Sequence, residues 1–155
     1  MIGSRTRSRE LALQVLFALD LREGEGQLRW DPTTLDDAEA SREVKLFADE
    51  LVQGVLADLP RLDKLIRASA ENWDLERLAC VDRNLLRLAV HELLSRDDIP
   101  PKVSINEAIE LGKRFSGAQS GPFINGILDR VRTDLGIAVE LTDEVGGSGD
   151  GGTLR

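Results

Sequence analysis

The chain has 155 residues, of which 41% are hydrophobic and 31% are charged, enough to bury the core of one domain or of two small helical halves. Its 28 acids and 20 bases give a net charge of −8, which argues against nucleic-acid binding through an overall positive charge. A single cysteine excludes an internal disulfide, and no apolar run approaches the roughly 18 residues of a membrane span. The N-terminus lacks the continuous apolar segment of a secretion signal, so we expect a cytoplasmic protein.

The first half of the chain carries apolar residues at helical spacing. We expect Ser4 to cap a first helix that runs to about Arg22, with one buried stripe. The polar stretch 27–40 is expected to be a loop, with room for one short helix. Ser41 then opens a second helix, and Pro60 begins a third, because proline fits the first turn of a helix.

The central part of the chain predicts a long helix from about Cys80 to Ser95. Its apolar side chains cover two adjacent flanks, so this helix is expected to be buried on more than one side and to lie at the centre of the fold. A double proline at 100–101 interrupts the chain after it. Ser104 and Glu107 then fit a capping box for the next helix, although that helix could also begin one turn earlier.

The end of the chain predicts one more helix and an acidic tail. Pro122 is placed in the first turn of the last helix, and Gly136 is expected to end it. No stretch alternates like a strand and no repeat is visible, so the predicted class is a compact all-α bundle over residues 1–138. Residues 139–155, rich in glycine and acids, are expected to be disordered.

A short basic run at the N-terminus departs from the acidic composition. Arg5, Arg7 and Arg9 precede the first acid, Glu10. On a helix Arg5 and Arg9 share one face while Arg7 points elsewhere, and each guanidinium offers paired donors to a phosphate. Because cations at a helix N-terminus oppose its dipole, the run is a poor choice for stability alone and favours a binding role. An ordinary solvated segment is the alternative.

Further candidate binding residues lie in the last third of the chain. Lys102, Lys113 and Arg114 add positive charge near the ends of one helix, although the last two also complement its dipole. Phe123 lies one position off the apolar stripe of the last helix, so its ring would either pack in the core or stack on an unpaired base. Gly126 within the same helix suggests a close approach of two helices.

Catalytic signatures are absent from the sequence. It has no glycine-rich phosphate loop and no cluster of Cys and His for a metal. Its one histidine, His91, is expected to have a structural role, and Cys80 is expected to be a small buried residue. We therefore predict a protein that is not an enzyme and that needs no cofactor or metal.

Four motifs together resemble the NusB family of transcription antitermination factors, in order and spacing, over about Arg5 to Leu135. The first is Arg-x-Arg-Glu-x-Ala-x-Gln-x-Leu-Phe, ending at Phe17, and the second is Val-Asp-Arg-Asn-Leu-Leu-Arg-Leu-Ala-x-x-Glu-Leu at 81–93. The others are Val-x-Ile-Asn-Glu-Ala-Ile-Glu-Leu at 103–111 and Phe-Ile-Asn-Gly-Ile-Leu-Asp at 123–129. The last two motifs are the most specific, whereas the arginine run alone is weak.

The resemblance implies about seven helices in two small subdomains. It also implies binding of boxA RNA in ribosomal RNA transcripts together with NusE, a small-subunit ribosomal protein, within an antitermination complex on RNA polymerase. Carried over to this chain, the RNA-binding residues would be Arg5, Arg7, Arg9, Lys102, Lys113, Ser120 and Phe123. The residues that meet NusE would be Phe17, Asp82 and, less directly, Glu107.

Two alternatives remain open at this stage. A similar domain begins some ribosomal RNA cytosine methyltransferases, but 155 residues leave no room for a methyl-donor domain. The chain could instead be a helical protein-interaction module, or a homodimer that hides the arginines and has little RNA binding of its own. Gel filtration and RNA titration would separate these from the first prediction.

Overall fold

The computed structural model describes residues 3–21, 41–70 and 78–137, and all its regular elements there are helices. This confirms the predicted all-α class, with six helices in the described residues where about seven were expected for the whole chain. The helices are α1 (Ser4–Leu21), α2 (Arg42–Ala57), α3 (Leu59–Ser69), α4 (Cys80–Ser95), α5 (Pro101–Phe115) and α6 (Ser120–Leu135). The predicted loop at 27–40 and the predicted disordered tail lie outside the described residues.

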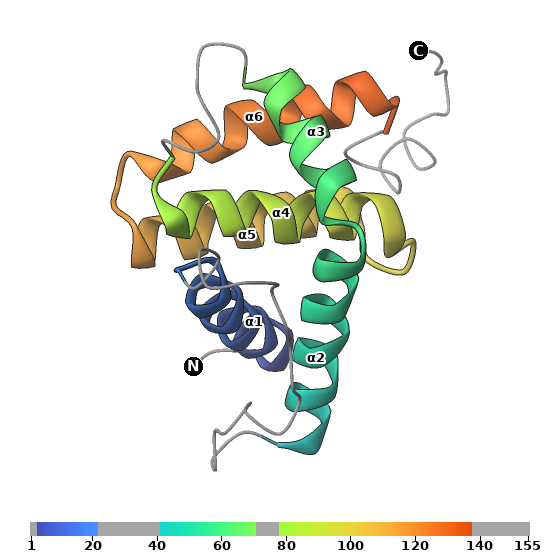
Figure 1. The fold of residues 1–155 in the computed structure, drawn as a ribbon, viewed down its shortest axis with the longest axis vertical. Coiled ribbons are helices and arrows are strands. Elements are labelled where there is room, and N and C mark those ends of the chain that lie inside the picture. The colour runs from blue at the N-terminus through green and yellow to red at the C-terminus, as the bar shows by residue number, and fades with distance from the viewer. Residues whose placement is uncertain (1–2, 22–40, 71–77, 138–155) are drawn as a thin grey trace, which may run out of the picture.

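Helix α4 is the centre of the fold, as its two apolar flanks predicted. Figure 1 shows it crossing the middle of the molecule, with α1 and α2 on one side and α3 and α6 on the other. It contacts each of the other five helices. Most of its residues are buried, including charged and polar ones such as Arg87, His91 and Glu92. The helix therefore fixes the positions of all the elements around it.

One continuous hydrophobic core joins the two halves of the molecule. It contains buried aliphatic side chains from all six helices, and its fully enclosed members include Leu51, Leu62, Leu86, Ile124 and Leu128. A second, small cluster of Leu11, Val44 and Ala48 closes the contact between α1 and α2. A core built almost wholly of aliphatic residues agrees with the low aromatic content.

Several helix ends follow the predicted local signals. The hydroxyl of Ser41 accepts a hydrogen bond from the backbone nitrogen of Val44 at 3.2 Å, which caps α2. Pro60 lies in the first turn of α3, where its missing N–H costs nothing. Gly136 ends α6 in the left-handed conformation, with φ of 74°, which a residue with a side chain rarely adopts.

The predicted cap of α1 is wrong, and α5 has the earlier of the two starts that the sequence allowed. The carbonyl of Gly3 accepts from the nitrogen of Arg7 at 2.9 Å, so Ser4 is the first residue of α1 and not its cap. Helix α5 begins at Pro101, one turn before the predicted box, because proline suits that first turn. Ser104 is consequently inside the helix, and its buried hydroxyl donates to the carboxylate of Glu92 at 2.7 Å.

The close contact between α5 and α6 is made at a different glycine from the one predicted. Gly126 is exposed, and a side chain added there would meet open space. At Gly112 an added Cβ would lie 2.7 Å from Cδ1 of the buried Ile124. It is therefore Gly112 that lets the two helices approach. None of the helices within the described ranges is long and apolar enough to cross a membrane.

Candidate nucleic-acid interface

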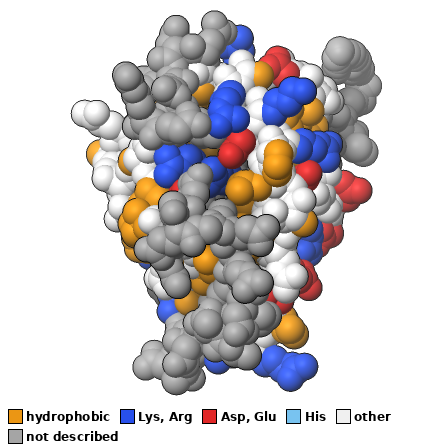
Figure 2. Space-filling model, viewed as in Figure 1, with side chains coloured by type: hydrophobic (Ala, Val, Ile, Leu, Met, Phe, Trp, Pro, Cys, Tyr) orange, Lys and Arg blue, Asp and Glu red, His pale blue; other side chains and the backbone are white. Residues whose placement is uncertain are grey.

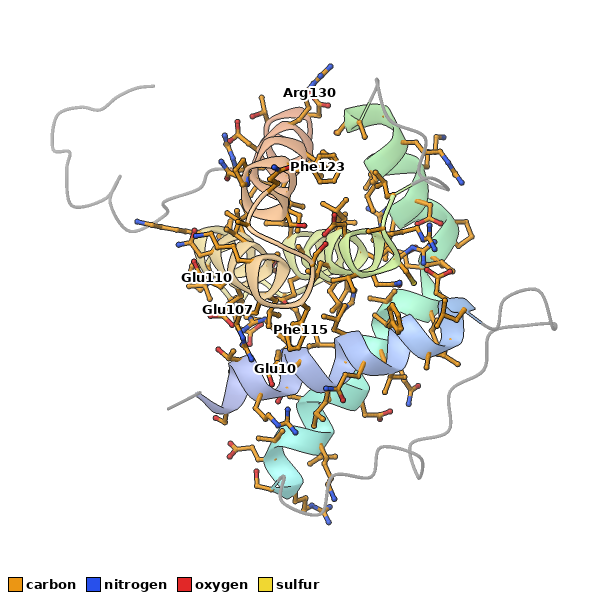
Figure 3. The ribbon with its side chains drawn as sticks, turned by 90° about the vertical axis from the view of Figure 1, so that its left-hand side faces the viewer. Glu10, Glu107, Glu110, Phe115, Phe123 and Arg130 are labelled. Carbon is orange, nitrogen blue, oxygen red and sulfur yellow. The ribbon has the colours of Figure 1, made fainter. Side chains whose placement is uncertain are left out.

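The first half of α1 is tied to α5 by side-chain contacts. The hydroxyl of Thr6 donates to the carboxylate of Glu107 at 2.7 Å. The buried carboxylate of Glu10 receives two guanidinium groups, that of Arg7 at 2.8 Å and that of Arg114 from the end of α5. Figure 3 shows Glu10 and Glu107 facing each other across this seam. Two cations thus share the carboxylate of Glu10, and Glu107 adds a second acid to the same seam.

The arginine predicted to begin the basic run, Arg5, is exposed and held in place. Its guanidinium carbon lies 3.9 Å from the centre of the Phe47 ring, a cation–π contact with α2. A groove of about 280 Å³ opens beside it, with Ser4, Leu46 and Arg96 among the lining residues. The stacking leaves the donors of Arg5 at the surface while restricting the side chain to one position.

Arg9 differs sharply from Arg5 and Arg7. Its side chain is 5% exposed, and two of its nitrogens each donate to Glu92 at 2.8 Å. A third nitrogen lies 3.5 Å from Glu107. Burial alone would lower the pKa of Arg9, but the hydrogen bonds and charge of Glu92 outweigh it and the pKa is raised. Arg9 therefore cross-links α1 to α4 and points into the protein.

The other predicted RNA-binding residues are spread over α5 and α6. Lys102 and Lys113 are exposed near the two ends of α5, and Lys113 lies 3.4 Å from Glu110. Phe123 is half-buried and packs against the core, which is the predicted alternative to base stacking. Figure 3 places it on α6, well apart from Glu10 on α1. The ring of Phe123 thus does not share the α1–α5 seam with Arg7.

A predicted RNA residue and a predicted partner residue are joined to each other. The hydroxyl of Ser120, the first residue of α6, donates to the carboxylate of Asp82 in the first turn of α4 at 2.8 Å. Both residues are less than a tenth exposed. Phe17, the other predicted partner residue, is half-buried on α1, and its carbonyl lies 4.0 Å from the sulfur of Cys80.

The opposite end of α1 holds a buried acid that sequence reasoning did not single out. Asp20 accepts from Arg83 at 2.8 Å, from Asn84 at 2.9 Å and from Arg87 at 3.3 Å. Burial would raise the pKa of Asp20, but these hydrogen bonds and charges outweigh it and the pKa is lowered. Burial raises the pKa of Cys80, which lies beside the same carboxylate. In the view of Figure 2, basic and acidic side chains of the described residues are interspersed.

Sequence reasoning also missed Phe115, the last residue of α5. It follows Leu111 and Gly112 at helical spacing, so periodicity does not distinguish it from a buried residue. In the structure it is 43% exposed, because the helix ends beyond the edge of the core. The guanidinium carbon of Arg114 lies 4.9 Å from the ring centre. In the sequence, Phe115 is marked only by the two basic residues before it, Lys113 and Arg114, and this pattern does not indicate that the ring is exposed.

Comparison with known proteins places this fold and surface in a class. The model of the NusB family matches residues 6–133. A relative from Sorangium cellulosum is 44% identical over 135 residues, covering 87% of this chain and 96% of its own. Another from Anaeromyxobacter dehalogenans is 46% identical over 144 residues, covering 87% and 94%. Both are transcription antitermination proteins, and the class is therefore a transcription factor and not an enzyme.

Solved structures agree with this class. NusB from T. maritima superposes with a TM-score of 0.76 at 38% identity, covering 86% of this chain and 94% of the other. A second structure, of antitermination factors NusB and NusE in complex with dsRNA, superposes with a TM-score of 0.73 at 25% identity, covering 86% and 99%. The chain belongs to the NusB family, as its four motifs predicted.

Proposed function

We propose that this protein is a transcription antitermination factor that binds boxA-type single-stranded RNA in ribosomal RNA transcripts. It does so together with NusE, as part of a complex on RNA polymerase in the cytoplasm. The observation that carries the proposal is the pair of arginines at the seam between α1 and α5, Arg7 and Arg114, which share the carboxylate of Glu10. Family membership and a similar structure that holds NusB and NusE with RNA support it.

Two arginines near the start of α1 can contact a nucleic acid, Arg7 at the α1–α5 seam and Arg5 on the side that faces α2. Arg5 and Arg7 present guanidinium groups from the first turn of α1, and each can donate to a phosphate. Phosphates give affinity that depends on salt and carries little sequence information. Lys102, Lys113, Ser120 and Phe123 would extend the RNA path over α5 and α6, as the family resemblance implies.

Arg9 takes a different part in this proposal. Because its guanidinium is buried against Glu92, it is a positioning residue that fixes α1 on α4 and so sets where Arg5 and Arg7 stand. Glu107 acts in a similar way through Thr6, besides its proposed place at the NusE surface. Phe17 and Asp82 complete the proposed partner surface.

The test is a titration of a labelled boxA-type RNA and a scrambled RNA, with and without NusE, across salt concentrations. We expect tighter binding of the boxA-type RNA and a fall in affinity with salt. Replacing Arg5 and Arg7 by alanine should weaken both RNAs and lower the slope of log K against log salt by about one for each lost contact.

The matched control removes the same charge from a different surface. Arg61 and Lys64 are exposed on α3, and their replacement by alanine should leave the titration unchanged. Equal and negligible binding of both RNAs under every condition, with and without NusE, would overturn the proposed function. Gel filtration of the same samples shows whether the protein is instead a homodimer that covers the arginines.

A further inference from the structure

The most exposed aromatic side chain of the described residues lies beside the proposed RNA surface. Phe115 is 43% exposed at the end of α5, where an apolar ring in water gains nothing for the stability of the fold. Figure 3 shows it close to Glu10, at the seam between α1 and α5. An exposed ring in this position is available to contact a ligand.

The chemistry around the ring identifies that occupant. Arg114 lies over the ring at 4.9 Å from its centre and also contacts the carboxylate of Glu10. Glu10 in turn binds Arg7 at 2.8 Å. One chain of contacts thus joins the ring to the exposed guanidinium of Arg114 and the half-buried one of Arg7. A flat apolar surface beside positive charge is the combination that binds a single-stranded nucleic acid.

We propose that Phe115 is a stacking platform for one unpaired base of the bound RNA, with Arg114 and Arg7 holding the phosphates on either side of that base. The inference rests on the proposed RNA-binding function and adds a subsite to it. A base inside a duplex is already stacked on both faces and paired along its edge, so neither face is free to lie on the ring. Phe115 therefore favours a single strand over a duplex.

The position of the turn after α5 leaves space for the base. Residues 116–119 connect α5 to α6, and an added side chain at Gly117 would meet open space. Ser116 and Gln119 are exposed as well. These residues, like Phe115 itself, are thus accessible from solvent.

The experiment compares Phe115→Leu with the wild-type protein on two RNAs, a boxA-type single strand and the duplex of the same strand. Base stacking on a ring contributes enough for a change of about tenfold in affinity. We expect the variant to bind the single strand about tenfold more weakly and the duplex unchanged. Phe115→Tyr keeps the ring and should keep wild-type affinity for both.

A second readout reports on stacking directly. RNA that carries 2-aminopurine at successive positions should lose fluorescence at one position on binding the wild-type protein, and Phe115→Leu should abolish that change. Leu21→Ala, at the far end of α1 and 65% exposed, is the control for loss of an exposed apolar side chain. Thermal unfolding should be the same for all variants, because Phe115 lies outside the core.

The outcomes separate the two proposals. If the wild-type protein binds neither RNA, the proposed function fails. If it binds the single strand and Phe115→Leu leaves the ratio of single-strand to duplex affinity unchanged, the stacking platform is refuted while RNA binding stands.

Discussion

Removing the guanidinium of Arg9 should unfold the protein more readily and not simply weaken a surface contact. In Arg9→Met the carboxylate of Glu92, which is 2% exposed, keeps the hydrogen bond from Ser104 at 2.7 Å but loses the guanidinium that contacts it at 2.8 Å. Leaving a buried charge without its partner costs about 3–5 kcal/mol. For a domain of this size we expect Tm to fall by roughly 10–15 °C.

Two further variants test whether the loss of stability comes from the unpaired carboxylate of Glu92. Arg7→Met removes a guanidinium whose side chain is 36% exposed, and Glu10 retains Arg114, so the expected loss is below about 1 kcal/mol. Replacing both members of the buried pair, with Arg9→Met and Glu92→Leu, removes the unpaired charge and should recover more than about 2 kcal/mol relative to Arg9→Met alone.

The assay is urea and thermal unfolding followed by circular dichroism at pH 7, with RNA affinity measured on the folded fraction. The reasoning is refuted if Arg9→Met unfolds within about 1 kcal/mol of the wild-type protein, or if the double variant is no more stable than the single one. A loss of RNA binding by Arg9→Met at a temperature where it is unfolded would say nothing of a phosphate contact.

Three further predictions concern the buried groups of the core. Asp20→Asn should cost about 3 kcal/mol in urea unfolding, because Arg83 loses its carboxylate, and an unchanged midpoint would show that the pair is solvated. Gly54→Ala should cost about 1–3 kcal/mol, since the new methyl group would collide with the His91 ring, and wild-type stability would show that the ring moves freely aside. Burial lowers the pKa of His91 from 6.5, so the unfolded chain takes up a proton first as the pH falls. Stability should therefore be full above about pH 6.5 and decline below it, and His91→Gln should lack that part of the decline between pH 7.5 and 5.5.

The central helix shows how far local pattern reaches. The limits of α4 coincide with the predicted Cys80 and Ser95, because a long stretch with two apolar flanks has few ways to be buried. Ser41 caps α2 as predicted, since its partner is three residues away. Helix limits and caps of this kind depend on residues that are close in sequence, so the sequence alone predicts them.

The candidate site was predictable only in part, for a different reason. Arg9 and Glu92 are 83 residues apart, so no local pattern shows that this arginine is neutralised while Arg5 is not. Ser104 looks like a cap because its distant acceptor on α4 is invisible to spacing. Phe115 looks buried because periodicity does not say where the core ends. Each miss concerns a contact or an edge set by the packing of whole helices.

The hydrogen bond between Ser120 and Asp82 links a predicted RNA-binding residue to a predicted partner-binding residue. It joins the beginning of α6 to the beginning of α4. A substitution at Asp82 that is designed to disturb the protein partner also releases the start of α6 and the turn that leads into it. Under the proposed roles of Asp82 and Ser120, variants at this position would affect binding of both the protein partner and the RNA. Ser120→Ala, which removes the same hydrogen bond from the other side, would tell how much of the effect is shared.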